Sequence, residues 1–402
     1  MMKEEINPAR WIEVDLEAIA HNTAQVKGLL SPGVRLMAVV KGDGYGHGLV
    51  PAARAALARG ADMLGVTHPE EGVVLREAGI AAPVLIFRPL LPGEEEIAAA
   101  YRLTVTLSDL QQAKRLAAAA RKIGERIPMH VKIETGMGRT GFTPASFWSE
   151  VDELLSLPEL KWEGIYTHFS AAAGDPSFTR RQFRVFREVV NTLAGRGIRI
   201  PLRHVCNSAA LLLYPEMHLD LVRAGTLLYG QLPAGIRSAP LSLRGTWSFW
   251  ARVVHLQRLP RGATVGYGRT YRVRRDTVLA VLPVGYSDGF GLDVAPRPAG
   301  WWDLVKVLGK TAGAFLGFPW GAYYVKVNGK SAPVVGRLGM GLCCVDVGKI
   351  PEVCIGTPVL LPARRTVISS AVPRLYVKGG EAALREPEGE SPFNRHDSSG
   401  ND

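Results

Sequence analysis

Short apolar runs alternate with helix-like segments between residues 34 and 225. The strands that these runs predict cover residues 34–40, 63–66, 84–87, 104–107, 129–133, 164–168, 204–206 and 221–223. The helical patterns between them include residues 51–58, 69–78, 108–123 and 179–193. Because strands that alternate with helices favour a parallel sheet, these eight repeats predict an α/β fold with a (β/α)8 barrel over residues 12–240.

The apolar pattern changes after residue 240, where short strand-like runs are separated by turn residues. The predicted strands there cover residues 253–256, 278–282, 324–327, 332–335 and 343–347. Asn328 and Gly329 lie between two of these runs and are a strong hairpin signal, because both tolerate a positive φ. We therefore predict a mainly β domain over residues 241–384, which residues 1–11 are expected to join.

Two segments of the second region depart from the strand pattern. Residues 295–323 contain Trp301, Trp302 and Trp320 among glycines and prolines, and we expect an inserted loop there. Residues 385–402 are rich in Glu, Ser, Asn and Asp. Such a composition buries too little apolar surface to fold, so these residues are predicted to form a disordered tail.

The composition is typical of a large soluble protein. Of the 402 residues, 47% are hydrophobic, which is enough for a large core. No apolar run reaches the length of a membrane span, and the N-terminus lacks the apolar centre of a signal peptide. The four cysteines form no C-x-x-C pair and no spaced metal-binding set. We therefore expect a cytoplasmic protein with no metal site and no membrane partner.

The formal net charge of +11 suits either nucleic acid or a small acidic ligand. The Lys and Arg residues are scattered, and even the densest runs, residues 180–184 and 272–275, lack the clustering that a nucleic-acid surface needs. We therefore expect no nucleic-acid partner. A phosphate or carboxylate group on a small molecule would use the same positive charge.

Chemically reactive residues follow the predicted strands at the end where (β/α)8 barrels carry their active sites. Lys41 follows the apolar first strand and precedes the glycine-rich residues 42–48. Burial and neighbouring cations lower the pKa of an amine, and a neutral amine can form a Schiff base with an aldehyde. A strand-end lysine that simply reaches solvent is the alternative, but the glycines favour a ligand because they permit close backbone approach.

The loops after the last two strands suit a phosphate group. Asn207 and Ser208 open a helix-like stretch, while Gly225 and Thr226 follow the eighth strand. In barrels these loops commonly bind phosphate through backbone N–H groups and a helix N-terminus. Asn207 and Ser208 also fit an ordinary helix cap, and the two interpretations are compatible.

Several blocks of sequence, taken in order, resemble the alanine racemase family. They are residues 39–41 with 45–48, 132–139, 167–169, 207–209, 223–225, 266–268 and 285–289. The resemblance runs from residue 11 to about residue 347 and resumes near residue 368. It implies a fold type III enzyme that uses pyridoxal 5′-phosphate (PLP) and works as a homodimer with active sites shared across the interface. The implied reaction interconverts L- and D-alanine, which supplies D-alanine for peptidoglycan.

The resemblance also implies roles for individual residues. Lys41 would bind PLP as a Schiff base and act as one catalytic base, and Tyr267 would act from across the dimer interface as the other. Arg223 would donate to the pyridine nitrogen. Arg139 would contact the cofactor and the substrate carboxylate, oriented by Lys132, which is carbamylated in many family members. The other implied cofactor-binding residues are Tyr45, His168, Asn207, Ser208, Gly225 and Thr226, and the other implied substrate-binding residues are Tyr286 and Met340.

An arginine at the ring nitrogen favours racemisation over other PLP reactions. Because Arg223 stays protonated and only donates, the nitrogen stays unprotonated and the ring is a weaker electron sink. Two bases on opposite faces can remove a proton from one side and return it to the other. Each residue also has an ordinary structural interpretation: Tyr267 as a hairpin aromatic, His168 as a hydrogen-bonded strand-end histidine and Arg223 as an ion-pair partner.

Two features depart from the family pattern. Gly339, Met340 and Gly341 stand where the family usually has Cys-Met-Asp, so a carboxylate near the substrate entrance is missing. The chain also passes from residues 356–361 almost directly to residues 368–374. The family normally inserts a helix there, with a motif similar to Thr-x-Asn-Tyr-Glu whose tyrosine contacts the PLP phosphate.

Three functions stay open at this point. The first is a racemase, for alanine or for another small amino acid such as serine. The second is a PLP-dependent decarboxylase, against which Arg223 argues because decarboxylation profits from a strong electron sink. The third is a catalytically weakened PLP-binding regulatory protein, which the two departures favour. PLP is expected to bind in each case, because Tyr45 and Ser208 remain.

Overall fold

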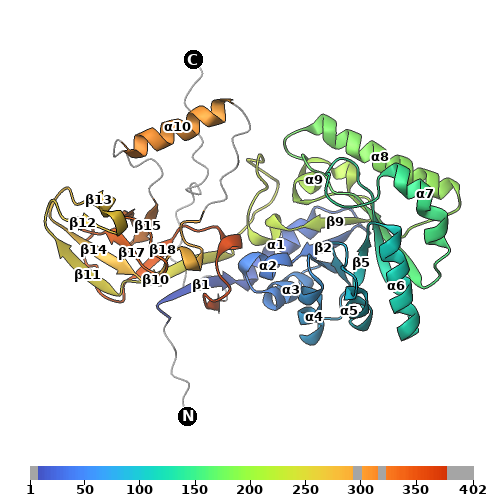
Figure 1. The fold of residues 1–402 in the computed structure, drawn as a ribbon, viewed down its shortest axis with the longest axis horizontal. Helices are drawn as coiled ribbons and strands as arrows, with labels where there is room; N and C mark the ends of the chain where they lie inside the picture. The colour runs from blue at the N-terminus through green and yellow to red at the C-terminus, as the bar shows by residue number, and fades with distance from the viewer. Residues whose placement is uncertain (1–7, 293–300, 316–322, 378–402) are drawn as a thin grey trace, which may run out of the picture. The chain divides into compact units, whose positions relative to one another are not determined.

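A computed structural model describes residues 8–292, 301–315 and 323–377 of the chain (Figure 1). The chain divides into two compact units, one formed by residues 15–246 and the other by residues 1–14 and 247–402. Among the described residues, the first unit contains a sheet of eight strands and the second a sheet of nine strands with a short two-stranded ribbon.

The unit of residues 15–246 is built on eight parallel strands in the order β8-β7-β6-β5-β4-β3-β2-β9. Their bounds are β2 Arg35–Val39, β3 Met63–Val66, β4 Val84–Ile86, β5 Thr104–Leu107, β6 Ile127–Lys132, β7 Leu160–Tyr166, β8 Leu202–His204 and β9 Leu221–Ala224. The backbone N–H of Asp220 donates to Arg203 (3.1 Å), and that of Arg223 donates to Cys206 (3.0 Å). These bonds link β8 to β9 and nearly close the barrel, so the predicted fold class is confirmed.

Helices cover the outside of these strands (Figure 1). They are α1 Leu16–Gly28, α3 Leu49–Leu57, α4 Pro69–Glu77, α5 Glu94–Ala100, α6 Leu110–Ile123, α7 Pro144–Leu155, α8 Pro176–Gly195 and α9 Ser208–Leu213. In α6 the residues Ala113, Leu116, Ala117 and Ala120 are buried, as the spacing of one helix face requires. Asp109 caps α6 by accepting from the backbone N–H of Gln112.

The unit of residues 1–14 and 247–402 is mainly β, as predicted. Its large sheet has the order β11-β14-β17-β16-β15-β18-β10-β1-β19, and β12 pairs with β13. The bounds are β1 Arg10–Asp15, β10 Trp247–Arg252, β11 His255–Leu259, β12 Thr264–Val265, β13 Tyr271–Arg272, β14 Thr277–Leu282, β15 Tyr324–Val327, β16 Lys330–Val335, β17 Cys343–Asp346, β18 Pro358–Leu361 and β19 Arg374–Val377. Asn328 (φ 48°) and Gly329 (φ 73°) form the hairpin turn between β15 and β16, which confirms that prediction.

The expected inserted loop is wrong over residues 301–315, which form the helix α10 (Trp301–Phe315). Trp301, Leu304, Val305 and Leu308 follow the spacing of one helix face, a signal that the surrounding glycines and prolines obscured. The rest of the expected loop, apart from Tyr323, and the predicted tail lie outside the described residues. Within the described ranges, no helix combines the length and the apolar character needed to cross a bilayer.

Candidate active site at the barrel mouth

The carboxyl ends of the barrel strands carry most of the predicted site residues. Lys41 follows β2, Lys132 ends β6, His168 follows β7 and Arg223 lies in β9. The positive charges of Arg223, Arg139, Lys132 and Lys41 all act on His168 and, after burial, lower its pKa to about 3. Because such electrostatic effects require proximity, the structure brings these five residues together at one mouth.

Lys41 opens a single turn, α2 (Lys41–Gly46), whose backbone is left-handed. The φ angles are 63° at Gly42, 55° at Asp43, 61° at Gly44 and 54° at Tyr45. L-residues pay roughly 1–2 kcal/mol each for this conformation, whereas glycine adopts it freely. The glycine-rich sequence therefore permits the turn, but contacts from the rest of the barrel must hold Asp43 and Tyr45 in it.

The Lys41 amine is half-buried and chemically suited to react as a nucleophile. Burial, followed by the charge of Arg139, lowers its pKa, while the carboxylate of Glu71 opposes the change. A lowered pKa increases the neutral fraction, which is the form that attacks an aldehyde. Of the environment predicted for Lys41, partial burial and one neighbouring cation, Arg139, are therefore present in the structure.

Arg223 is buried, with 3% of its surface exposed. Its Nη1 donates to Nδ1 of His204 (2.6 Å) and to the His204 carbonyl (3.2 Å). Its Nη2 donates to the carbonyls of Thr167 (2.9 Å) and Val205 (3.0 Å) and lies 3.3 Å from Nδ1 of His168. Burial lowers the Arg223 pKa to about 10, so the group stays charged near neutral pH. These hydrogen bonds all use Nη1 or Nη2, and among the described residues no hydrogen bond of Nε is found.

A buried chain of side chains extends from Arg223 into the barrel. Because a guanidinium only donates, Nδ1 of His204 must accept, and the His204 proton lies on Nε2. That nitrogen is 2.8 Å from Nδ1 of His130, whose own Nε2 lies 3.7 Å from the carboxylate of Glu163. Tyr166 stacks on His204 with ring centroids 4.7 Å apart. His204, His130 and Glu163 are not among the residues predicted from the sequence, because a lone histidine or glutamate within a strand carries no distinctive signal.

The buried histidines predict that the folded protein loses stability in mild acid. Burial and Arg223 hold the pKa of His204 well below its usual value, and burial lowers that of His130. Below about pH 6.5 the unfolded chain takes up protons that the folded chain does not, so each such histidine destabilises the fold by about 1.4 kcal/mol per pH unit. Urea unfolding at about pH 7.5 and pH 5 measures this slope. His204→Gln should reduce the change of unfolding free energy with pH, whereas His255→Gln, at an exposed histidine, should not. Equal unfolding free energies at both pH values would show that the buried histidines do not have this effect.

The phosphate-binding residues predicted from the last two loops also lie together. The backbone N–H of Gly225 donates to the Ser208 hydroxyl (3.0 Å). A Cβ atom added to Gly225 would lie 2.6 Å from the Tyr45 hydroxyl, so only glycine leaves room there. The Thr226 hydroxyl is buried and has no hydrogen-bond partner among the described residues. The side chain of Asn207 caps α9 by accepting from the backbone N–H groups of the next turn and donates to a carbonyl, so it fixes this loop.

The loop that carries Arg139 is held by two ionisable side chains. The carboxylate of Glu134 accepts from the backbone N–H groups of Gly136 and Met137, each at 2.5 Å. Nζ of Lys132 donates to the Thr140 hydroxyl at 2.5 Å. Burial, and then the charge of Arg139, lowers the Lys132 pKa to about 8. The Arg139 side chain is exposed at the mouth, where it can meet a carboxylate.

The remaining predicted residues lie together in the unit of residues 1–14 and 247–402. Tyr267 begins the turn η3 (Tyr267–Arg269) and is 76% exposed, while Tyr286 begins η4 (Tyr286–Asp288). The backbone N–H of Tyr286 donates to Gly339 (3.1 Å), next to the exposed Met340. A Cβ added to Gly266 would lie 2.8 Å from the Arg337 nitrogen, so residues 336–340 pack against both turns.

The two departures from the family pattern are visible in the same unit. A Cβ added to Gly341 would meet no atom within 4 Å, so the position has space for a larger side chain. Residues 362–373, between β18 and β19, contain the short 3-10 turn η5 (Arg365–Val367) and a turn that the backbone N–H of Val372 closes by donating to Ser369 (3.2 Å). The carbonyl of Val367 packs so closely on Gly289 that a Cβ there would lie 2.3 Å away.

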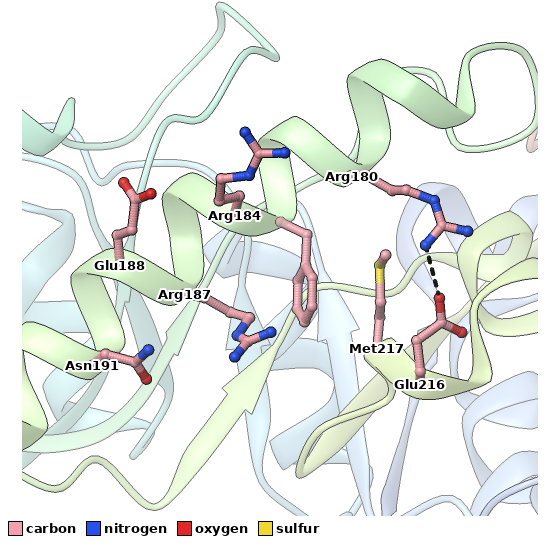
Figure 2. A pocket seen from close by; sticks show the side chains of 8 residues that line it. Arg180, Arg184, Arg187, Glu188, Asn191, Glu216 and Met217 are labelled. Carbon is pink, nitrogen blue, oxygen red and sulfur yellow. Dashed lines mark hydrogen bonds and ion pairs between the residues drawn. The ribbon is translucent and has the colours of Figure 1, made fainter.

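A hollow of about 480 Å³ lies between α8 and the turn η1 (Pro215–Met217) (Figure 2). Arg180, Arg184 and Arg187 line it from α8, and Arg180 lies 3.5 Å from the carboxylate of Glu216. None of the predicted site residues lines this hollow. We therefore place the candidate active site at the barrel mouth.

Comparisons with known proteins agree with one another along the chain. Residues 14–233 match the family model described as "Alanine racemase, N-terminal domain", and residues 246–372 match "Alanine racemase, C-terminal domain". The alanine racemase of Desulforamulus reducens is 39% identical over 398 residues, which cover 94% of this chain and 100% of that protein. The alanine racemase of Desulfovibrio desulfuricans is 37% identical over 352 residues, covering 87% and 88%.

Solved structures give the same result. An alanine racemase from Clostridium difficile 630 superposes with a TM-score of 0.83 at 28% identity, covering 94% of this chain and 98% of that one. The alanine racemase from Bacillus anthracis, solved with bound L-Ala-P, superposes with a TM-score of 0.81 at 29% identity, covering 94% and 97%. The likeness therefore includes both units of the chain.

Proposed function

Because the chain belongs to the alanine racemase family, we propose that it interconverts L- and D-alanine, with PLP bound by Lys41. The observation that carries this proposal is that Lys41 and Arg223 come from neighbouring barrel strands, since Met37 of β2 pairs with Arg223 of β9. A half-buried amine after one strand and a buried guanidinium on the neighbouring strand suit a ring that carries both an aldehyde and a pyridine nitrogen.

The residues at the barrel mouth fit PLP in their donor chemistry. Lys41 supplies an amine for the aldehyde, while Ser208, Tyr45 and the backbone at Gly225 supply a phosphate site. The Thr226 hydroxyl supports this site, because it is buried without a hydrogen-bond partner in the described part of the chain, whereas a buried polar group of this kind usually has one. When bound, PLP withdraws electrons from the Cα–H bond of the substrate.

Two side chains move the proton in the proposed reaction. Lys41 takes or returns the Cα proton at Nζ on one face of the substrate, since its lowered pKa leaves part of the amine neutral. The partner subunit's Tyr267 does the same at its hydroxyl on the opposite face. A proton removed from one face and returned on the other inverts the carbon centre.

Two arginines control charge in the proposed site. Arg223 would donate to the ring nitrogen when PLP is bound, and because a charged guanidinium only donates, that nitrogen would remain unprotonated. Arg139 presents an exposed guanidinium to the substrate carboxylate, and Lys132 and Glu134 hold its loop in place. His168, with a pKa of about 3, stays neutral and adds no further positive charge beside Arg223.

A homodimer is part of this proposal. Tyr267, Tyr286 and Met340 are 76%, 46% and 65% exposed, respectively. Large exposed side chains gathered in this way are typical of an interface rather than of free surface. The proposed dimer would bring these residues to the barrel mouth of the partner subunit, where Tyr286 and Met340 would limit the space for the substrate.

Deuterium incorporation tests the proposed reaction directly. The full-length protein with PLP is incubated in D2O with L-alanine or D-alanine, and Cα deuteration and the enantiomer ratio are followed by NMR and chiral chromatography. We expect deuterium at Cα and conversion from both enantiomers, with slower or no reaction of serine. Bound PLP without exchange from either enantiomer would refute the racemase and favour the weakened PLP-binding protein that Gly341 and the missing motif suggest.

A further inference from the structure

Glu71 links the Lys41 turn to a neighbouring helix. It lies in the first turn of α4, which follows β3, the strand beside β2. Its Oε2 accepts from the backbone N–H groups of Thr67 (2.8 Å) and His68 (3.0 Å). Its Oε1 accepts from the backbone N–H of Gly42 at 2.6 Å. One carboxylate therefore holds backbone groups from the loops that follow two different barrel strands.

Capping of α4 explains only part of this arrangement. A glutamate near a helix start commonly accepts from the N-cap backbone, and the bond to His68 is of that kind. The bond to Gly42 contributes nothing to α4, because Gly42 follows β2 and is 29 residues away in sequence. Hydrogen bonds to a charged acceptor are stronger than neutral ones, so the Gly42 contact is a strong link between the two loops.

The Gly42 contact lies at the start of the left-handed turn. Further along, the side chain of Asp43 accepts from the backbone N–H of Leu49 (2.9 Å), and Nδ1 of His47 lies 2.9 Å from the carbonyl of Gly44. Tyr45 stacks on Tyr229 with ring centroids 4.8 Å apart. Strained backbone persists only where several contacts determine it. Among the described contacts, the hydrogen bond that the Gly42 N–H donates to Glu71 is the one that holds the residue directly after Lys41.

The Glu71 carboxylate also balances the charge around the Lys41 amine. Burial, followed by the positive charge of Arg139, lowers the pKa of this amine, and the negative charge of Glu71 raises it. Across the mouth Lys41 acts in turn on His168. A carboxylate tied to the backbone beside Lys41 therefore affects both the position and the charge of the amine.

We propose that Glu71 is a positioning residue, which ties Gly42 to the start of α4 and so fixes the backbone from which the Lys41 side chain extends. The importance of this for turnover rests on the proposed role of Lys41. The geometric part of the proposal does not, because it concerns the order of residues 40–48 in the protein without cofactor.

Glu71→Gln tests the proposal, with Glu70→Gln as the matched control. A glutamine side chain has one acceptor oxygen and one NH2 group. The NH2 group would therefore face backbone N–H groups that now donate to Glu71, and their hydrogen bonds would be lost. Glu70 is exposed on the same helix, and its replacement removes the same charge without touching Gly42. Hydrogen–deuterium exchange of the cofactor-free full-length protein should show residues 40–48 exchanging at least about tenfold faster in Glu71→Gln. Glu70→Gln should match the wild type.

Two further measurements separate positioning from general damage. The pKa of Lys41, measured by pH-dependent amine labelling of the cofactor-free protein, should fall in Glu71→Gln because a neighbouring negative charge is lost. In the holoenzyme, kcat should fall by about tenfold or more with a smaller change in KM. Glu71→Asp keeps the charge but shortens the reach, so residues 40–48 should again exchange faster while the Lys41 pKa changes less. This variant provides the test if Glu71→Gln does not fold.

Unchanged exchange of residues 40–48 in both Glu71 variants would overturn the proposal. Faster exchange confined to residues 67–77, with residues 40–48 unaffected, would also overturn it, because Glu71 would then serve only as a helix cap. Faster exchange of residues 40–48 and a lower Lys41 pKa without any loss of turnover would show that Glu71 orders the turn but does not position Lys41 for the reaction, which would overturn the positioning role. The proposed function would stand in that case, because Lys41→Ala tests the PLP lysine separately.

Discussion

Lys41→Ala is expected to abolish the visible absorption of lysine-bound PLP and to lower racemisation by at least about 10³-fold. The physical reason is that alanine removes both the amine that would bind the aldehyde and one of the two proposed bases, and either loss alone is large. Absorption spectroscopy after dialysis measures the bound cofactor, and the deuterium assay measures turnover.

The rival amine at the mouth is Lys132, because burial lowers its pKa to about 8. Borohydride reduction of the holoenzyme followed by peptide mapping distinguishes the two lysines. We expect PLP on the peptide that contains Lys41, and PLP on Lys132 would contradict the assignment. Thr226→Val is the contrasting variant. It removes a buried hydroxyl for which the described residues offer no partner and which we assign to the phosphate site, so it should weaken PLP binding while the absorption band of lysine-bound PLP remains.

Tyr267→Phe is expected to lower racemisation in both directions by about 10²- to 10⁴-fold, the range typical of a lost general acid–base group. Only the hydroxyl is removed, and because the side chain is 76% exposed, folding and PLP binding should be unaffected. The proton on the face served by Lys41 should still exchange with solvent. We therefore expect deuterium incorporation to persist for one enantiomer and to be lost for the other.

The control for Tyr267→Phe is Tyr324→Phe, which removes the hydroxyl of another exposed tyrosine in the same unit. Tyr324 lies in β15 and is not among the proposed site residues, so its variant should behave as the wild type. Unchanged turnover of both enantiomers in Tyr267→Phe would rule out the two-base assignment. A loss of dimer in the same variant would assign Tyr267 to the interface instead.

The fold class follows from local sequence to a large extent. Apolar runs separated by helical patterns lead to a parallel sheet, because buried strands joined by helices have few other arrangements. The same reasoning places Lys41, His168 and Arg223 at one mouth, since residues that end parallel strands share one edge. The helix α10 was missed because glycine and proline near residues 295–323 outweighed a helical spacing of only four apolar residues.

The partners of the site residues could not be predicted in this way. Glu71 and Gly42 are 29 residues apart, and His130 and His204 are 74 residues apart. Nothing in the sequence around one residue of such a pair specifies its partner, because the contact depends on strand register and on the order of strands in the nearly closed barrel. The left-handed turn could not be predicted from local sequence either. Gly42 and Gly44 permit a positive φ but do not require one, and the L-residues Asp43 and Tyr45 disfavour it.

The sequence by itself determined which residue types stand at the ends of the strands, because the periods of strands and helices are local properties of the chain. It also determined the family, through motifs that keep their order. The tertiary structure alone decided which groups hold those residues: Glu71 on the Lys41 turn, and His204 and His130 behind Arg223. The physical reason is that hydrogen bonds and pKa changes depend on distance and burial, which arise only when distant segments pack together.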